Sequence, residues 1–459
     1  MPDEKPTTLP FASKAGYGLG DLGFLLVWHG TALFLLYFYT DILGIKPGLA
    51  GAIYLIAMIW DAVLDPVVAA WAERHAMRKG RYAGIISWAA LPVGMGYVLL
   101  FLMPPLSGTA LVVWALFAHL AFRTAYTFAS MPYNTLPVRL STQARDRNAL
   151  SGFRVAGAAT GAIITAVLTP LVVVAAQEQQ QSEAAGYLFA AVIIGGLAAM
   201  LLWACSRIVK ESEGQRATPG AANYASAVIR MFRAASANRP LQYMLAVLVF
   251  ATIGSGLFTH TILFFAIHVL ARPDAVTALL GLSALATILA APLWVFFASR
   301  TSKKVALMSG LILAGFGYGL LAFAQQGGIT LPLIAVVITG GGGAAIPVML
   351  WSIVPDTIEY GEAHSGERIE ARTFGLATFA QKTAMGLTAL LAGGLLSLSG
   401  YQGGETPDAN ALSAMSALVS WLPAAFMIAV ALIIARYPVT EAMHRQILAE
   451  LASRKTEGP

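Results

Sequence analysis

Two carboxylates, Asp61 and Asp65, lie four residues apart in a segment that is otherwise apolar enough to cross a membrane. At this spacing both side chains project from one face of a helix. An ionised side chain near the centre of a bilayer costs about 2.5 to 3.5 kcal/mol, so we expect the pair to face a polar cavity. Hard monovalent cations prefer oxygen ligands, and a buried carboxylate also binds a proton. The pair therefore predicts a site for Na⁺ or H⁺.

The composition places this pair in a membrane protein. The 459-residue chain is 58% hydrophobic and only 11% charged, with a mean hydropathy of +0.70, whereas about a quarter of the residues of a soluble domain are charged. Apolar stretches of about 20 residues are long enough to cross a bilayer, and they must be helical there. Twelve such spans are predicted, at about 20–43, 49–72, 83–103, 109–137, 149–175, 185–207, 240–270, 275–298, 304–324, 330–355, 373–399 and 412–436.

The basic residues gather in loops that alternate spans place on one side of the membrane, which predicts that both termini are cytoplasmic. They are scattered over several short loops, so no nucleic-acid partner is expected. No removable signal segment is apparent at the start of the sequence. The predicted organisation is a six-helix bundle over 1–207, a polar cytoplasmic linker with a short amphipathic helix over 208–239, a second six-helix bundle over 240–436 and a cytoplasmic tail over 437–459.

Five sequence motifs carry a resemblance to a known family. They are YGLGD at 17–21, FYTDILGI at 38–45, WDAVLDP at 60–66, YTFASMPYNTL at 126–136 and DTIEYGEAHSGERIEARTFGLATFAQK at 356–382. In this order they resemble the glycoside-pentoside-hexuronide:cation symporters of the major facilitator superfamily, the group of melibiose permease. The resemblance implies an all-α membrane protein of twelve helices in two pseudo-symmetric six-helix halves that rock about a site near the midplane.

What the resemblance implies for function is symport of a small solute, a sugar, glycoside or related organic molecule, with H⁺ or Na⁺ in a bacterial cytoplasmic (inner) membrane. No cofactor or further metal is implied, and the protein would function as a monomer. The expected cation ligands are Asp61 and Asp65 together with two hydroxyl groups, those of Thr127 and Ser130. The alternative is that the aspartates form an ion pair with Arg123 that only joins the second and fourth spans. Leu64 replaces an asparagine of the family between the aspartates, which favours H⁺ slightly.

The predicted substrate-binding residues are Trp28, His29, Arg123, Tyr126, Asn134, Arg154, Thr378 and Lys382. Arg154, Thr378 and Lys382 match polar residues of the family, whereas Phe24 and Leu25 replace its sugar-binding Lys and Asp. Arg123 has no counterpart in melibiose permease. It either neutralises the aspartates when no cation is bound or binds an anionic group of the substrate.

Ion pairs that close the cytoplasmic side are expected among Arg78, Arg81, Asp356, Glu359 and Arg368. The sequence contains no phosphate-binding loop, zinc-binding His-Glu-x-x-His or nucleophile elbow, so we expect no enzyme. Because apolar residues replace the sugar-binding pair, a sodium-coupled symporter of lysolipids or other amphipathic molecules is the main alternative. A membrane-embedded enzyme or a sensor is less favoured.

Overall fold

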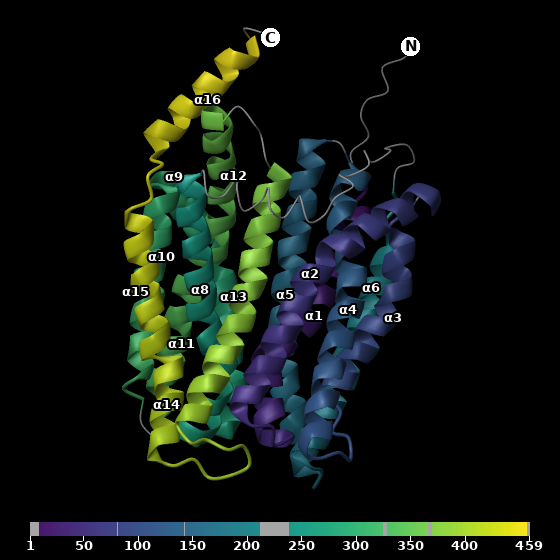
Figure 1. The fold of residues 1–459 in the computed structure, drawn as a ribbon, viewed down its shortest axis with the longest axis vertical. Helices are drawn as coiled ribbons and strands as arrows, with labels where there is room; N and C mark the ends of the chain where they lie inside the picture. Colours follow the sequence, from purple (N-terminus) through teal and green to yellow (C-terminus); the bar gives the residue numbers. More distant parts are fainter. Residues whose placement is uncertain are drawn as a thin grey trace. The chain divides into compact units, whose positions relative to one another are not determined.

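The computed structural model describes residues 9–79, 81–141, 143–211, 238–324, 328–365 and 370–456. The chain divides into two compact units. Unit 1 comprises Met1–Gly220 and Tyr401–Thr406, and unit 2 comprises Ala221–Gly400 and Pro407–Pro459. Every regular element in the described ranges is a helix (Figure 1), which confirms the all-α prediction. The division falls inside the predicted linker, whose expected amphipathic helix lies outside the described residues.

Within its described residues, unit 1 contains six long helices. They are α1 (Phe11–Tyr37), which continues into the π-helical turn η1 (Phe38–Ile42), α2 (Pro47–Lys79), α3 (Ala83–Leu100), α4 (Gly108–Leu140), α5 (Ala144–Glu178) and α6 (Glu183–Ile208). The main packing partners are α1 with α5 and α6, α3 with α4 and α6, and α2 with α4. Glycine permits the closest of these approaches, since a Cβ on Gly157 of α5 would lie 2.1 Å from the carbonyl oxygen of Gly18 in α1.

The other helices of the described residues lie in unit 2. They are α8 (Arg239–Phe264) with its π-helical end η2 (Phe265–Val269), η3 (Pro273–Ala275), α9 (Val276–Arg300), α10 (Lys303–Leu321), α11 (Thr330–Gly343), α12 (Ala345–Ser365), α13 (Glu370–Leu398), α14 (Ala409–Val419), α15 (Trp421–Ala435) and α16 (Glu441–Thr456). Two predicted spans each contain two helices, α11 with α12 and α14 with α15. In each case a single non-helical residue interrupts the span.

Eleven segments in the described part of the chain have the length and apolar composition needed to cross a membrane. Each coincides with a predicted span. The twelfth predicted span is α13, whose 29 residues are long enough. Its hydropathy is lowered by Gln381, Lys382 and Thr383 in the middle of the helix. A helix with a lysine at that depth is expected to have a polar surrounding there.

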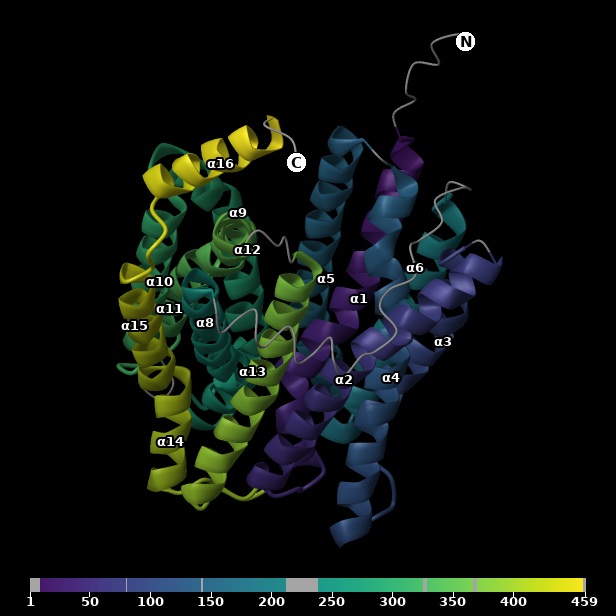
Figure 2. The same cartoon turned by 45° about the horizontal axis from the view of Figure 1, so that its top comes forward.

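The sequence did not predict two features at the ends of the spans. The expected tail forms α16, which packs on α12 (Figures 1 and 2) through a small cluster of Ala363, Ile447 and Leu451. The segment Tyr401–Thr406 belongs to unit 1, where the Tyr401 hydroxyl donates to Asp41 in η1. Burial raises the pKa of this hydroxyl, so it stays protonated and able to donate at neutral pH.

Candidate functional site

The predicted carboxylate pair lies at the contact between α2 and α4. The hydroxyl of Thr127 donates a hydrogen bond of 2.6 Å to Oδ1 of Asp61 and lies 3.5 Å from Oδ1 of Asp65. Asp61 and Thr127 are completely buried, and Asp65 is half-buried. The spacing of four residues has therefore placed both carboxylates on one face of α2, towards one hydroxyl group. Three of the four predicted cation ligands are brought together within unit 1.

Local sequence explains why further oxygen atoms are available here. Pro66 follows Asp65 inside α2 and has no backbone N–H, so the carbonyl of Ala62 lacks its usual helical donor. That carbonyl lies between the two aspartates in the sequence and is a candidate ligand that the sequence analysis missed. The fourth predicted ligand, Ser130, is buried, and its hydroxyl has no hydrogen-bond partner among the described residues. Its participation stays a prediction.

Arg123 lies one helical turn before Thr127 and is completely buried. The centre of its guanidinium group lies 4.8 Å from the ring centroid of Trp28, at a distance typical of a cation–π contact. In the part of the chain that the structure describes, its Nε and Nη1 atoms have no hydrogen-bond partner. The alternative of an ion pair between Arg123 and the aspartates stays a prediction, because the third guanidinium nitrogen, Nη2, is not among these two atoms. The guanidinium has donor capacity left for another group.

Aromatic side chains form a wall beside this arginine. The rings of Trp28 and Tyr126 have centroids 5.4 Å apart, and Phe24 meets Tyr126 edge to face at 5.2 Å. Trp28 is half-buried, whereas Phe24 is buried. The structure thus brings together three of the predicted substrate-binding residues, Trp28, Arg123 and Tyr126.

Arg154 of α5 is paired with an acid that the sequence analysis did not assign to the site. Its Nε donates to Oδ1 of Asp21 in α1 at 3.1 Å, and its guanidinium lies 5.7 Å from the ring of Tyr133. Asp21 is the last residue of the YGLGD motif. Because only 7% of its side chain is exposed, an unpaired charge there would be costly. The sequence did offer a signal for this pair, because Asp21 is an acidic residue inside a predicted membrane span.

The other predicted substrate-binding residues are His29 and Asn134 in unit 1 and Thr378 and Lys382 in unit 2. His29 follows Trp28 in α1, and its Nδ1 is buried without a partner among the described residues. Asn134 is exposed near the end of α4. Thr378 and Lys382 lie one turn apart on α13 of unit 2, where Lys382 is buried to 9% exposure and the Thr378 hydroxyl donates to the carbonyl of Phe374. Their predicted roles are left as predictions.

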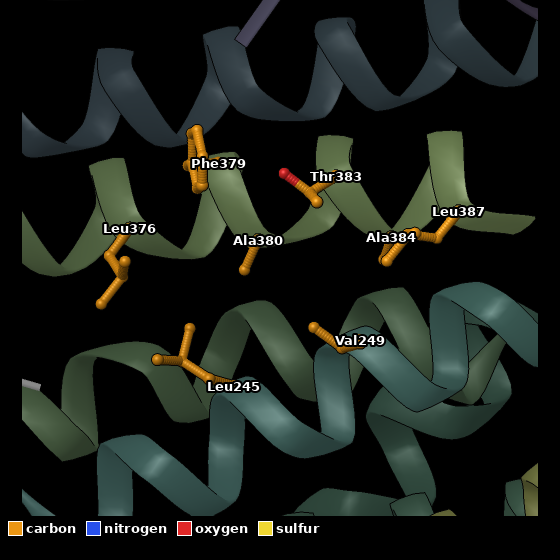
Figure 3. Close-up of a pocket in the computed structure, with 8 residues that line it drawn as sticks. All are labelled: Leu245, Val249, Leu376, Phe379, Ala380, Thr383, Ala384 and Leu387. Atoms are coloured by element: carbon orange, nitrogen blue, oxygen red, sulfur yellow. The ribbon is translucent and has the colours of Figure 1, made fainter. Parts of the chain in front are cut away.

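A small apolar pocket of about 230 Å³ lies beside these residues, between α13 and α8. Figure 3 shows Leu376, Ala380 and Ala384 of α13 on the side that faces Leu245 and Val249 of α8. Its polar lining consists of Thr383 alone among the residues that form it. The pocket could accept an apolar group but offers no charged ligand.

The acidic residues of the predicted cytoplasmic gate have partners in their own unit. Lys303 of α10 donates to Asp356 at 2.8 Å, and His444 of α16 contacts Glu359. The carboxylates and His444 have ligand atoms within 4.8 Å of one another, a spacing that a metal ion could use, but Lys303 already balances Asp356. Arg81 lies in unit 1, the side chain of Arg78 is not described and Arg368 lies outside the described residues. Pairing of these acids with the predicted arginines stays a prediction.

Comparison with known proteins identifies the family. The model of the family described as "MFS/sugar transport protein" matches residues 16–441. The chain belongs to this family. Its resemblance to the glycoside-pentoside-hexuronide:cation symporters is thereby confirmed, and the family comprises transporters and not enzymes.

Similar proteins cover nearly the whole chain. A glucuronide carrier protein homolog of Escherichia coli (strain K12) is 24% identical, with 97% of this chain and 96% of the relative covered. An inner membrane symporter of the same strain is also 24% identical, with 98% and 97% covered. Among solved structures, a bacterial homolog of the human lysosomal transporter Spinster has a TM-score of 0.68 at 15% identity, with 96% of this chain and 98% of that chain covered, which shows a shared fold. The chain is thus a multi-pass transporter of a bacterial inner membrane.

Proposed function

We propose that this protein is a symporter that couples the movement of a small solute, a sugar, glycoside or related organic molecule, to H⁺ or Na⁺ by alternating access. The observation that carries the proposal is the Thr127 hydroxyl placed between the carboxylates of Asp61 and Asp65. A buried group of two acids and a hydroxyl supplies the negative charge and the oxygen ligands that a monovalent cation needs. A purely structural contact between α2 and α4 would not need two carboxylates.

The solute would lie against Trp28 and Tyr126. An indole ring offers a flat apolar face to the C–H surface of a sugar ring, and the neighbouring polar groups fix its hydroxyls. The guanidinium of Arg123 lies on the Trp28 ring with donors to spare, which supports a solute that also carries an acidic group. Similarity to a glucuronide carrier homolog supports the same class. The solute, its acidic group and the coupling ion are proposals.

Transport by the full-length protein in sealed liposomes tests this proposal. Uptake of labelled glycosides and hexuronides is measured with an imposed Na⁺ gradient at fixed pH, and separately with a pH gradient without Na⁺. We expect one gradient to drive accumulation, and we expect Asp61→Asn and Asp65→Asn to abolish accumulation. Asp274→Asn is the matched control, because this carboxylate is exposed and forms an ion pair with the neighbouring Arg272, away from the carboxylate site.

Two results would contradict the proposal. In the first, the Asp61→Asn and Asp65→Asn variants accumulate as much solute as the wild type does under both gradients. The other is uptake that only equilibrates the solute and ignores both ions. If lysolipids are accumulated and no sugar or organic anion competes, the solute class is wrong although the coupling site stands.

A further inference from the structure

A polar cavity lies in unit 1, where α3 begins and α6 ends. Its volume is about 370 Å³. It is lined by Arg81, Ala83, Gly84 and Ser87 at the start of α3 and by Ser206 and Arg207 at the end of α6. The positive-inside rule assigns this end of the helices to the cytoplasmic side. None of these residues belongs to the carboxylate or aromatic cluster of the transport site.

The cavity is basic. Arg81 and Arg207 are exposed, and neither forms an ion pair with a carboxylate of the described residues. Arg139 adds a third positive charge nearby, since its guanidinium lies 5.3 Å from the ring of Tyr82. Among the described residues at this position, the acid Glu211 accepts hydrogen bonds from the backbone amides of Tyr82 and Ala83 at 3.0 and 2.7 Å. Glu211 therefore caps the start of α3, and the exposed side chains of Arg81 and Arg207 are the basic groups that line the cavity.

An apolar surface leads away from the cavity along α3. Trp88, Leu91 and Met95 are 68%, 63% and 63% exposed and follow one another at helical spacing from the cavity residue Ser87 onwards. In a membrane-spanning helix such an exposed stripe contacts lipid chains. Trp88 begins the stripe at the level where tryptophan favours the boundary between headgroups and chains.

A matching stripe runs along α6. Met200 and Trp203 are 57% and 48% exposed, and the guanidinium of Arg207 lies 5.3 Å from the Trp203 ring. The two helices are held together where Gly94 meets Gly195, since a Cβ on Gly94 would lie 2.5 Å from the Gly195 carbonyl oxygen. Exposed apolar residues of two helices that pack together therefore adjoin the basic cavity.

We propose that this cavity binds the phosphate group of an anionic phospholipid, with Arg81 and Arg207 as its ligands and the acyl chains lying on the stripes of α3 and α6. Guanidinium groups bind phosphate oxygens through paired hydrogen bonds. Basic pockets between membrane helices on the cytoplasmic side are suited to acidic headgroups. The adjoining apolar stripes favour a lipid over free phosphate, which has no part that would contact them.

Native mass spectrometry of the full-length protein tests this proposal. The protein is released from liposomes of phosphatidylcholine that contain phosphatidylglycerol, and the retained lipid is counted for the wild type, Arg81→Gln, Arg207→Gln and the double variant. We expect each single change to weaken retention of phosphatidylglycerol about tenfold, and the double change to abolish it. Arg300→Gln is the matched control, because Arg300 also ends a helix over an aromatic ring, that of Phe296, but does not line the cavity.

Fluorescence locates the lipid independently of retention. Brominated phosphatidylglycerol should quench the wild-type protein more than brominated phosphatidylcholine does, and Trp203→Phe should remove most of that difference. The proposal is overturned if the double variant retains phosphatidylglycerol as the wild type does, or if inorganic phosphate at equal concentration displaces the lipid. Unfolding temperatures in pure phosphatidylcholine, which should be unchanged by the arginine substitutions, separate lost binding from misfolding.

Discussion

Replacing Thr127 by valine removes one hydroxyl group from the carboxylate site while keeping the side-chain shape. That hydroxyl donates to buried Asp61 at 2.6 Å. A hydrogen bond to a charged group contributes about 1.5 to 3 kcal/mol. Since each 1.4 kcal/mol is a factor of ten in an equilibrium constant, the substitution should change cation binding by about tenfold to a hundredfold.

The sign of this change depends on the coupling ion, which makes the variant informative. If the ion is Na⁺, Thr127→Val removes an oxygen ligand, and the Na⁺ concentration for half-maximal uptake should rise by about tenfold or more. If the ion is H⁺, the lost hydrogen bond destabilises the ionised carboxylate, so protons bind more tightly. The pH at half-maximal uptake should then move upwards by about one to two pH units, at about 1.36 kcal/mol per unit.

Initial uptake rates in liposomes, measured over Na⁺ concentration and over pH, give both quantities. Thr124→Val is the control, because its hydroxyl lies one turn earlier on α4 and contacts Trp60 and the Leu120 carbonyl, not the aspartates. A Thr127→Val protein whose Na⁺ and pH dependences both equal those of the wild type would refute a cation site at this hydroxyl.

Three further experiments test residues around the site and in the helix contacts of unit 1. Arg123→Gln should raise the apparent cation affinity in the same uptake assay, because the two carboxylates then attract the cation without a competing positive charge. If only the affinity for anionic solutes falls, Arg123 binds the substrate instead. Gly157→Ala should lower the unfolding temperature through overpacking worth about 1 to 3 kcal/mol, whereas Gly152→Ala, whose new Cβ meets open space, should not. Asp21→Asn combined with Arg154→Gln should unfold at a higher temperature than Arg154→Gln alone, because the single change leaves a buried carboxylate without its partner.

The membrane spans and the two acids of the site could be predicted from the sequence, because both depend only on the spacing of residues along the chain. Membrane spans follow from the length of apolar runs, and the helix period alone places Asp61 and Asp65 on one face. Which helix packs against the Asp61 and Asp65 face of α2 could be predicted only through the family resemblance. The resemblance pointed to the helix that carries Thr127. The structure confirms that contact at hydrogen-bond distance.

Contacts between residues distant in sequence could not be predicted, because nothing local encodes them. Arg154 was expected to face substrate, yet it lies 133 residues from its partner Asp21 in sequence and pairs with it across the α1–α5 contact. Glu359 was expected to pair with an arginine of the gate, which stays a prediction, and His444 of α16, in the segment predicted as a cytoplasmic tail, contacts it. In both cases, the burial of a lone charge required a partner, but its identity depended on tertiary packing.

The charges in unit 1 bear on whether Arg123 replaces the coupling ion or works beside it. Asp21 and Arg154 neutralise each other in a direct ion pair. Asp61 and Asp65 together carry two negative charges against the single positive charge of Arg123, which leaves one negative charge to be balanced. A site of this kind, away from water, is most stable when its charges cancel. We therefore expect Arg123 to offset one carboxylate and to leave the other for one monovalent cation, so that coupling persists in the wild type with a single cation per transport cycle.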